Sequence, residues 1–301
     1  MAQAQNWFGA WVPRGAWGLG LGWRQKPPVG ARTVPQHPLL AQCRIFSVMN
    51  EMSSLVVMNH APGGLGRHGV WHTLAAGGLV PDYVMTEEGP CTRHLRSNSH
   101  AVKYGDFPDW FISGSFTVGV RVRITADAGL SRYICGDYDG GSNSSFVLRA
   151  SAANRFQFWW ENPAGTAPAV TGAVAVTLAQ WYTVMATWDG TTRRLYVDGA
   201  ADGTEATAQG RADVGLSACA GRAGEFNGGH FTGELGWFGL WGRQLSAVEA
   251  FTMHADPYCV FENLDRFDPI RTRGRRGHGP GDEPAAGAGT VADRLLRRMR
   301  F

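Results

Sequence analysis

The chain has 301 residues, of which 44% are apolar and 18% charged, and its formal net charge at pH 7 is +3. Such a chain can bury a large core, and its charge is too small to favour nucleic acid as a partner. It holds no run of about 18 apolar residues, so the sequence predicts no membrane-spanning helix. The five cysteines are widely spaced and form no C-x-x-C pair, which argues against a disulfide framework or a zinc ribbon.

The first 35 residues are rich in tryptophan, glycine and proline and show no hydrophobic period. They cannot form a core alone, and exposing their rings to water would cost about 25 cal/mol per Å². The arm therefore either folds back on the rest of the chain or anchors on a partner protein, and we favour anchoring. The anchoring side chains would be Trp7, Phe8, Trp11, Trp17 and Trp23.

Residues 36–262 carry strand patterns. Apolar and polar side chains alternate from Ser115 to Thr125, and the same period of two recurs in residues 144–150 and 154–161. Residues 234–243 are apolar on both faces, which is typical of a strand in the middle of a domain.

The stretch Trp181 to Gly199 predicts two strands joined by a tight turn. Tyr182, Val184, Ala186 and Trp188 fall on one face of an extended segment. The Asp189-Gly190 pair predicts a two-residue turn with positive φ at both positions, and a second Asp-Gly pair closes the next strand. The centre of the chain is therefore expected to be a β-meander.

One helix is predicted near the end of this region. Ser246 and Glu249 form a capping box, in which each side chain satisfies a backbone N–H of the first turn. Asp256, which precedes a proline, is expected to end the helix. Many antiparallel strands, glycine turns and a single short C-terminal helix predict an all-β antiparallel sandwich.

The sequence WYTVMATWDGTTRRLYVDG at residues 181–199, with GELGWFGLW at 233–241, resembles laminin-G-like, concanavalin-A-like jelly-roll domains. Residues 37–51 are similar to the first strand of the versions found in tailed-phage and prophage structural proteins. The resemblance covers residues 36–262 and implies a concanavalin-A-like jelly roll between an N-terminal arm, 1–35, and a tail, 263–301. It departs from the family pattern at residues 52–88, and the fold by itself does not fix a function.

Catalysis is not expected. Glucanases of this architecture carry their carboxylates as E-x-D-x-E on one strand, and the sequence has no such run. Glu161, Glu225 and Glu234 are isolated, and an isolated carboxylate is usually a solvated strand end. A hydrolase becomes a serious alternative only if two of these three lie across one groove.

A calcium site is one hypothesis for the segment 137–143. Asp137, Asp139 and Asn143 place two carboxylates and an amide on a glycine-containing loop, and oxygen ligands on a flexible turn suit Ca²⁺. The alternative, which we favour, is a surface turn in which these side chains cap their own backbone. No other cofactor is expected.

Trp159 is the best candidate for stacking against a sugar. It shares a strand face with Arg155, Gln157 and Glu161, a mixture of flat apolar surface and hydrogen-bonding groups. The alternative is that this face packs under a loop or against a neighbouring subunit. The sequence favours neither.

The tail is rich in arginine, glycine and proline, and residues 291–300 could form a short amphipathic helix. On docking into a groove this helix would bury Leu295, Leu296 and Met299. The alternatives are contact with an anionic surface and a solvated, disordered tail.

These observations lead to one functional expectation and two alternatives. A domain type that normally works outside cells, no recognisable signal peptide, no active site and two docking extensions predict a non-enzymatic bacteriophage virion protein. It would be a capsid decoration, head fibre or tail-associated protein, made in the host cytoplasm. Its partners would be other virion proteins, further copies of itself and a cell-surface glycan. The alternatives are a bacterial calcium-dependent lectin and, less favoured, a polysaccharide hydrolase.

Overall fold

The fold is seen in a computed structural model, which describes residues 26–27, 31–34, 36–52, 54–62, 67–73, 82–106, 114–127, 129–138, 140, 144–162, 165–166, 169–206, 215–224 and 230–262. The chain divides into two units, Met1–Asn263 and Leu264–Phe301, and all the described residues belong to the first. Within them, no helix is long and apolar enough to cross a membrane. The predicted anchoring residues of the arm and of the tail lie outside the described residues: Trp7, Phe8, Trp11, Trp17, Trp23, Leu295, Leu296 and Met299.

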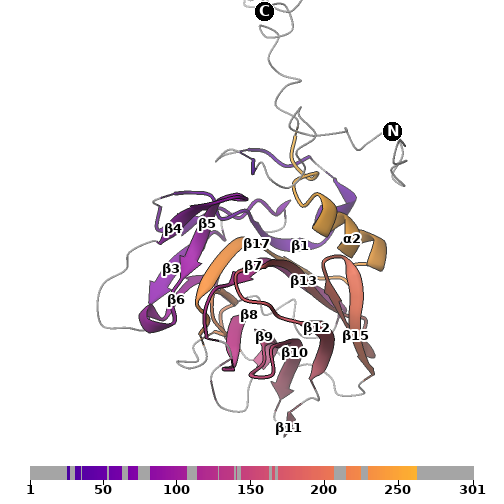
Figure 1. Cartoon of the computed structure of the whole chain (residues 1–301). Coiled ribbons are helices and arrows are strands. Elements are labelled where there is room, and N and C mark those ends of the chain that lie inside the picture. Colours follow the sequence, from indigo (N-terminus) through magenta and orange to yellow (C-terminus); the bar gives the residue numbers. More distant parts are fainter. Residues whose placement is uncertain are drawn as a thin grey trace, which may run out of the picture. The chain divides into compact units, whose positions relative to one another are not determined.

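The described residues form two antiparallel sheets (Figure 1). Sheet 1 has the order β15-β14-β13-β7-β17-β5-β4. An additional strand, β1, also pairs with β17. Its strands are β1 (Cys43–Ser47), β4 (Tyr83–Thr86), β5 (Gly89–His94), β7 (Phe116–Ile124), β13 (Trp181–Trp188), β14 (Thr192–Val197), β15 (Ala200–Ala206) and β17 (Gly233–Trp241).

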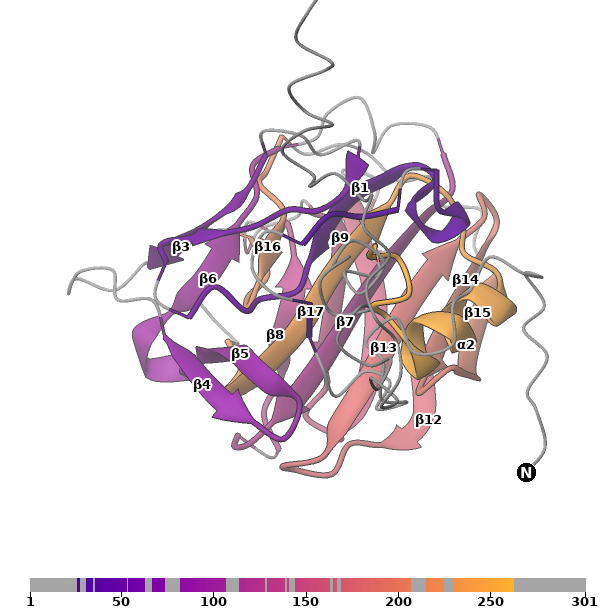
Figure 2. The same cartoon turned by 90° about the horizontal axis from the view of Figure 1, so that it is seen from above.

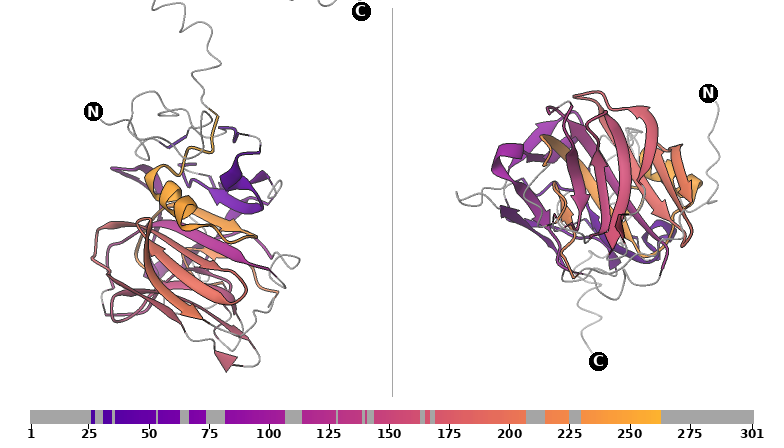
Figure 3. Two further views of the ribbon diagram at one scale, coloured as in Figure 1. Left: turned by 90° about the vertical axis from the view of Figure 1, so that its right-hand side faces the viewer. Right: turned by 90° about the horizontal axis from the view of Figure 1, so that it is seen from below.

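Sheet 2 has the order β11-β10-β9-β8-β16-β6-β3-β2, and β12 pairs with β10. Its strands are β2 (Val56–Val57), β3 (Gly69–Thr73), β6 (His100–Lys103), β8 (Arg132–Gly136), β9 (Ser144–Ala150), β10 (Arg155–Asn162), β11 (Gly165–Thr166), β12 (Val170–Ala175) and β16 (Cys219–Ala220). Figure 3 shows the two sheets stacked as layers. The predicted antiparallel β-sandwich is therefore confirmed.

Short helices complete the described fold: η3 (Pro38–Leu40), η5 (Arg96–Asn98) and α2 (Ala247–Ala255). The capping box predicted for α2 is present, since the Ser246 hydroxyl accepts from the Glu249 N–H and the Glu249 carboxylate accepts from the Ser246 N–H. The helix ends before Asp256, as expected. It contacts β13 and β15 and lies over the outer side of sheet 1 (Figure 2).

The main core fills the space between the sheets. The inward side chains of β7, at alternate positions from Phe116 to Ile124, are all fully buried. They pack against Phe156, Phe158 and Trp160, which the period of two in β10 turns toward the same interior. The strand faces predicted from alternation are confirmed in β7, β10 and β13.

A second core lies on the outer side of sheet 1 and explains why β17 is apolar on both faces. Leu235 and Leu240 point into the main core, whereas Trp237 and Trp241 point outward and are covered by α2, η3, β1 and residues 258–261. Trp241 also donates its indole N–H to the carbonyl of Leu39, at 2.6 Å. The expectation of a strand buried on both faces is confirmed.

The two Asp-Gly turns differ, and one prediction about them is wrong. At the first turn only Gly190 has a positive φ. Three residues, 189–191, lie between the two strands, and Asp189 Oδ1 accepts from the N–H groups of Thr191 and Thr192. The two-residue turn with positive φ at both positions is the second one, at Asp198 (φ 50°) and Gly199 (φ 80°).

The described part of the N-terminal arm packs against the sandwich. Thr33 forms an antiparallel bridge with Phe261, flanked by hydrogen bonds from the Val34 N–H to the Val260 carbonyl and from the Glu262 N–H to the Arg32 carbonyl. These contacts fasten the two described ends of the chain to each other.

Lys26 is buried beside the same core. Its ammonium donates to the carbonyls of Val48, at 2.8 Å, and of Pro90, and burial lowers the pKa of this lysine. All five cysteines are buried free thiols, in agreement with the sequence.

Candidate functional site

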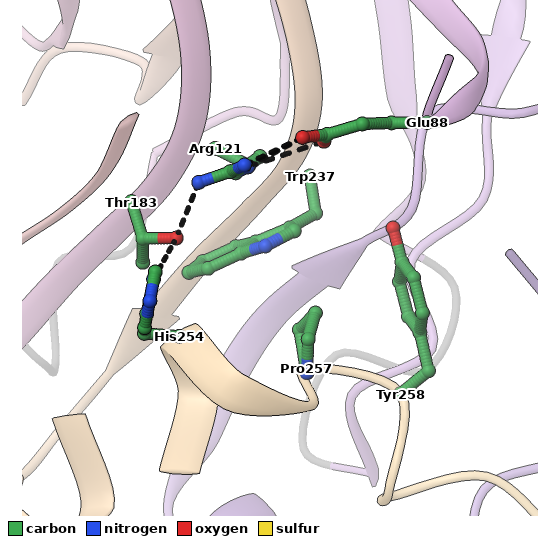
Figure 4. Close-up of a pocket in the computed structure, with 7 residues that line it drawn as sticks. All are labelled: Glu88, Arg121, Thr183, Trp237, His254, Pro257 and Tyr258. Atoms are coloured by element: carbon green, nitrogen blue, oxygen red, sulfur yellow. Dashed lines mark hydrogen bonds and ion pairs between the residues drawn. The ribbon is translucent and has the colours of Figure 1, made fainter. Parts of the chain in front are cut away.

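A shallow depression lies on the outer side of sheet 1 beside the end of α2. Figure 4 shows the side chains that converge on it: Glu88, Arg121, Thr183, Trp237, His254, Pro257 and Tyr258. Strand pairing places three of them side by side, since Arg121 of β7 lies opposite Thr183 of β13 on one side and Trp237 of β17 on the other.

One wall of the depression is a buried ion pair. The Arg121 Nε lies 3.1 Å from each oxygen of Glu88, and Nη2 lies 2.5 Å from Oε1. Burial raises the pKa of the Glu88 carboxyl, and the hydrogen bonds and charge of Arg121 oppose that shift. This bidentate pair fixes the orientation of both side chains and occupies both carboxylate oxygens.

Thr183 links this pair to the helix. Its hydroxyl accepts from Arg121 Nη1, at 3.1 Å, and lies 3.2 Å from Nδ1 of His254. Asp198 Oδ1 accepts from the Thr183 N–H at 2.8 Å and lies 3.6 Å from both Arg121 Nη1 and His254 Nδ1. Burial has the largest effect on His254 and lowers its pKa, Asp198 raises it, and Arg121 lowers it. Because the net pKa lies below the usual value for histidine, the imidazole is neutral at pH 7.

The opposite wall carries two further polar groups, one from Trp237 and one from Tyr258. The indole N–H of Trp237 is buried and has no hydrogen-bond partner in the described part of the chain. The Tyr258 hydroxyl also lines the depression, and burial holds the pKa of that phenol well above its usual value. Neutral donors beside a fixed ion pair suit a polar, uncharged ligand such as a sugar hydroxyl.

The predicted sugar-stacking face lies on the outer side of sheet 2. Trp159 is only 6% exposed, because Tyr138 packs edge-on against its ring and the Arg149 guanidinium lies 5.4 Å from the ring centroid. Arg149 also donates to Gln157, at 3.0 Å, and to the Tyr133 hydroxyl, at 3.1 Å. The ring is therefore covered by groups of its own chain.

The other predicted members of this face, Arg155 and Glu161, lie on the same strand and are half-buried. Ligand binding by this face stays a prediction.

Asp137 is fully buried at the start of the predicted calcium loop. Its Oδ1 accepts from the N–H groups of Ser145, at 2.8 Å, and Phe146, at 2.9 Å, so the carboxylate caps the start of β9. Asp139 and Asn143 lie outside the described residues. Within those residues, no group of three His, Cys, Asp or Glu side chains is placed to hold a metal ion.

The two isolated glutamates that the structure describes, Glu161 and Glu234, are not brought together. Glu161 lies on β10 in sheet 2, whereas Glu234 lies on β17 in sheet 1 and pairs with Arg123 at 2.9 Å. Glu225 is outside the described residues.

Sequence reasoning missed the depression. The sequence shows Arg121 as a polar residue on the outward face of β7, and an arginine buried on a strand almost always has a partner. Its partners Glu88 and Thr183 come from segments 33 and 62 residues away in the chain, and strand pairing across the sheet decides that they meet. The pattern of a single strand carries no such information.

Comparison with known proteins identifies the family to which the fold belongs. A family model described as the concanavalin A-like lectin/glucanases superfamily matches residues 96–250. No curated protein matches the sequence.

Among solved structures, domain 4 of an extracellular arabinanase from Geobacillus stearothermophilus, in complex with arabinotriose, is similar at a TM-score of 0.54 and 12% identity. The match covers 71% of this chain and 98% of that one. The binding domain of a paraclostridial mosquitocidal protein is similar at a TM-score of 0.53 and 12% identity, over 72% of this chain and 52% of that one.

The binding domain of botulinum neurotoxin serotype D is similar at a TM-score of 0.53 and 10% identity, over 71% of this chain and 50% of that one. The match thus spans about half the length of each toxin domain. At such identities the likeness concerns the fold alone.

Proposed function

The chain belongs to the concanavalin A-like lectin/glucanases superfamily, and from this premise we propose that it is a non-enzymatic carbohydrate-binding protein. The sugar contact would be the depression lined by Arg121, Thr183, Trp237, His254 and Tyr258. A sandwich that presents neutral donors and acceptors beside a fixed ion pair is suited to hold sugar hydroxyls.

The observation that carries the proposal is the engagement of both Glu88 oxygens by Arg121. A glycosidase needs a carboxylic acid that can transfer a proton and a second carboxylate about 5–9.5 Å away. Glu88 is the one carboxylate among the lining residues, and its oxygens are held in a charge-assisted pair. Such a group orients its neighbours and is poorly placed to protonate a leaving group.

The test is a glycan array probed with the full chain, followed by calorimetry with the saccharides that bind. Arabinotriose is included as a probe because the similar arabinanase domain was solved in complex with it. We expect binding that weakens in Trp237→Phe, which removes the indole N–H and keeps a ring. The control is Trp71→Phe, since Trp71 of β3 in sheet 2 donates to the Tyr83 hydroxyl and does not line the depression. Hydrolysis of any bound saccharide would contradict the proposal.

We propose further that the sandwich is displayed on a tailed-phage particle as a decoration, head fibre or tail-associated protein. The resemblance of residues 37–51 to phage and prophage proteins supports this, as does the tryptophan-rich composition of residues 1–25. The pairing of Thr33 with Phe261 also suits attachment through both ends at one place. Weak sugar contacts would then gain avidity from many displayed copies. Mass spectrometry of purified particles tests this context, and absence of the chain from them would exclude it.

A calcium-dependent lectin is the alternative, and a chelator arm in the same array tests it. The Asp137 carboxylate caps two backbone N–H groups, so we expect no loss of binding in EDTA. A loss would instead assign calcium to the 137–143 loop.

A further inference from the structure

Arg193 is buried in a way that the fold alone does not explain. It lies at the start of β14, opposite Trp188 in β13 and Glu205 in β15, and its side chain turns into the sandwich. Its exposed fraction is 0%, and Nε, Nη1 and Nη2 all lack a hydrogen-bond partner within the described residues.

An arginine left in this state would be costly. Burying a guanidinium without acceptors costs several kcal/mol, because its N–H groups lose water and gain nothing in exchange. The guanidinium does lie 4.4 Å from the ring centroid of Trp160, and such a cation–π contact offsets only part of that cost. The ring face also leaves the N–H donors, which point along the guanidinium plane, unsatisfied.

Trp160 adds a second orphan donor at the same place. Its side chain is fully buried, and its Nε1 has no hydrogen-bond partner in the described part of the chain. Two side chains from facing sheets, in contact with each other, thus present buried N–H groups without an acceptor.

The other buried arginines of the described residues each have at least one acceptor, although Nε and Nη1 of Arg132 have none. Arg121 has the Glu88 carboxylate, and Arg132 donates to the Ser151 carbonyl, at 2.9 Å, and to Asn154 Oδ1, at 2.7 Å. Arg193 differs because none of its three nitrogens has an acceptor among the described residues, and a bound ligand could supply one.

We propose that Arg193 and Trp160 form a binding site for a carboxylate. A carboxylate only accepts hydrogen bonds, cancels the guanidinium charge and matches the arginine fork with two coplanar oxygens. The carboxylate belongs either to a small free acid or to an acidic sugar such as a uronic acid. The site is distinct from the depression of Figure 4, because Arg193 points between the sheets and the depression lies on the outer side of sheet 1.

The experiment measures the melting temperature of the full chain in a carboxylate-free buffer, against increasing acetate, glucuronate or, as the neutral reference, glucose. Potassium chloride keeps the ionic strength constant. We expect a carboxylate-dependent rise in wild-type melting temperature and none with glucose. The rise should vanish in Arg193→Met and persist in Arg194→Met, because the neighbouring Arg194 forms an outward ion pair with Asp189, at 2.6 Å.

The two sources give different results. A rise with acetate and none with glucuronate assigns a small free acid, whereas a rise with glucuronate assigns an acidic sugar. No carboxylate-dependent rise in the wild type, or an equal rise in Arg193→Met, would overturn the proposal. Arg193→Met alone can raise the basal melting temperature by removing a buried charge, so only the dependence on ligand is compared.

Two milder variants keep the test decisive if Arg193→Met does not fold. Arg193→Lys keeps the charge and loses the planar fork, and Trp160→Phe keeps a ring and loses the N–H. Each should weaken carboxylate binding about tenfold by calorimetry, the cost of one charge-assisted hydrogen bond. Unchanged affinity in both would also overturn the proposal.

Discussion

At the scale of single residues, the stability that an ion pair contributes depends on how deeply the pair is buried. Arg121 and Glu88 form a pair whose side chains are 10% and 3% exposed, whereas the Arg93–Asp82 pair has side chains 45% and 18% exposed. Water screens the attraction between the charges of the exposed Arg93–Asp82 pair, and it screens the buried Arg121–Glu88 pair much less. Breaking the buried pair at Glu88 leaves the Arg121 guanidinium with only Asp198 as a counter-charge, at 3.6 Å and 36% exposed.

Glu88→Leu should therefore lower the free energy of unfolding by about 3–5 kcal/mol, because it strands the Arg121 guanidinium. Adding Arg121→Met should recover most of that loss. Chemical denaturation of the two single variants and the double variant measures the coupling.

Arg93→Ala is the matched surface control, and we expect it to cost less than about 1 kcal/mol. A Glu88→Leu loss as small as that of Arg93→Ala would show that water reaches the pair.

At the scale of elements, the hairpin from β14 to β15 depends on one glycine. Gly199 has a φ of +80°, and a Cβ there would lie 3.0 Å from the Cα of Phe251 in α2. Gly190 has a φ of +104°, and its Cβ would meet nothing within 4 Å. The two positions share a positive φ, which glycine adopts without strain, and differ in the approach of the helix.

Gly199→Ala should destabilise the chain more than Gly190→Ala does. Both substitutions bear the cost of a positive φ, on the order of 1 kcal/mol, and only the first pushes α2 away from the sheet. Thermal unfolding of the two variants gives the comparison. Equal losses would mean that the helix moves aside without cost.

The cap of α2 offers a second test at this scale. Ser246→Ala removes the acceptor for the Glu249 N–H and should cost about 1 kcal/mol. Ser246→Asp, which retains a capping oxygen, should lose less. Denaturant titrations distinguish the two, and an equal loss would assign the effect to the Arg243–Glu249 ion pair that shares this turn.

The elements also show which parts of the fold can be predicted from the sequence. The period of two identified β7, β9, β10 and β13 because one face of each strand is buried against the facing sheet. It could not identify which Asp-Gly pair forms the two-residue turn. Both pairs carry the same local signal, and the difference lies in whether Asp189 caps the loop backbone. The depression was beyond reach because its residues meet only through strand pairing.

At the scale of the whole molecule, buried histidines set the response to acid. Burial lowers the pKa values of His60, His94 and His230 to about 4. His94 is stacked between Trp71 and Phe231, with ring centroids 5.3 and 5.5 Å away. In the unfolded chain these imidazoles titrate near pH 6.5, so the unfolded state binds more protons between pH 6.5 and 4.

We therefore expect the contribution of these histidines to stability to be constant above about pH 7 and to fall steadily between pH 6.5 and 4. For His94 alone the loss at pH 4 is on the order of 3 kcal/mol. Urea unfolding at several pH values measures the slope, and His94→Gln should flatten it whatever its cost at pH 7. A slope unaffected by His94→Gln would contradict the assignment.

The clasp between Thr33 and Phe261 has a mechanical consequence. Its strands run antiparallel, and the chain enters and leaves it on the same side. Tension applied between the two ends would first load the contacts of Lys26 with Val48 and Pro90, and once these parted it would break the backbone bonds of the clasp one after another. Tethering both ends to one support would instead leave the clasp unloaded, and the sandwich would swing as a rigid body under shear.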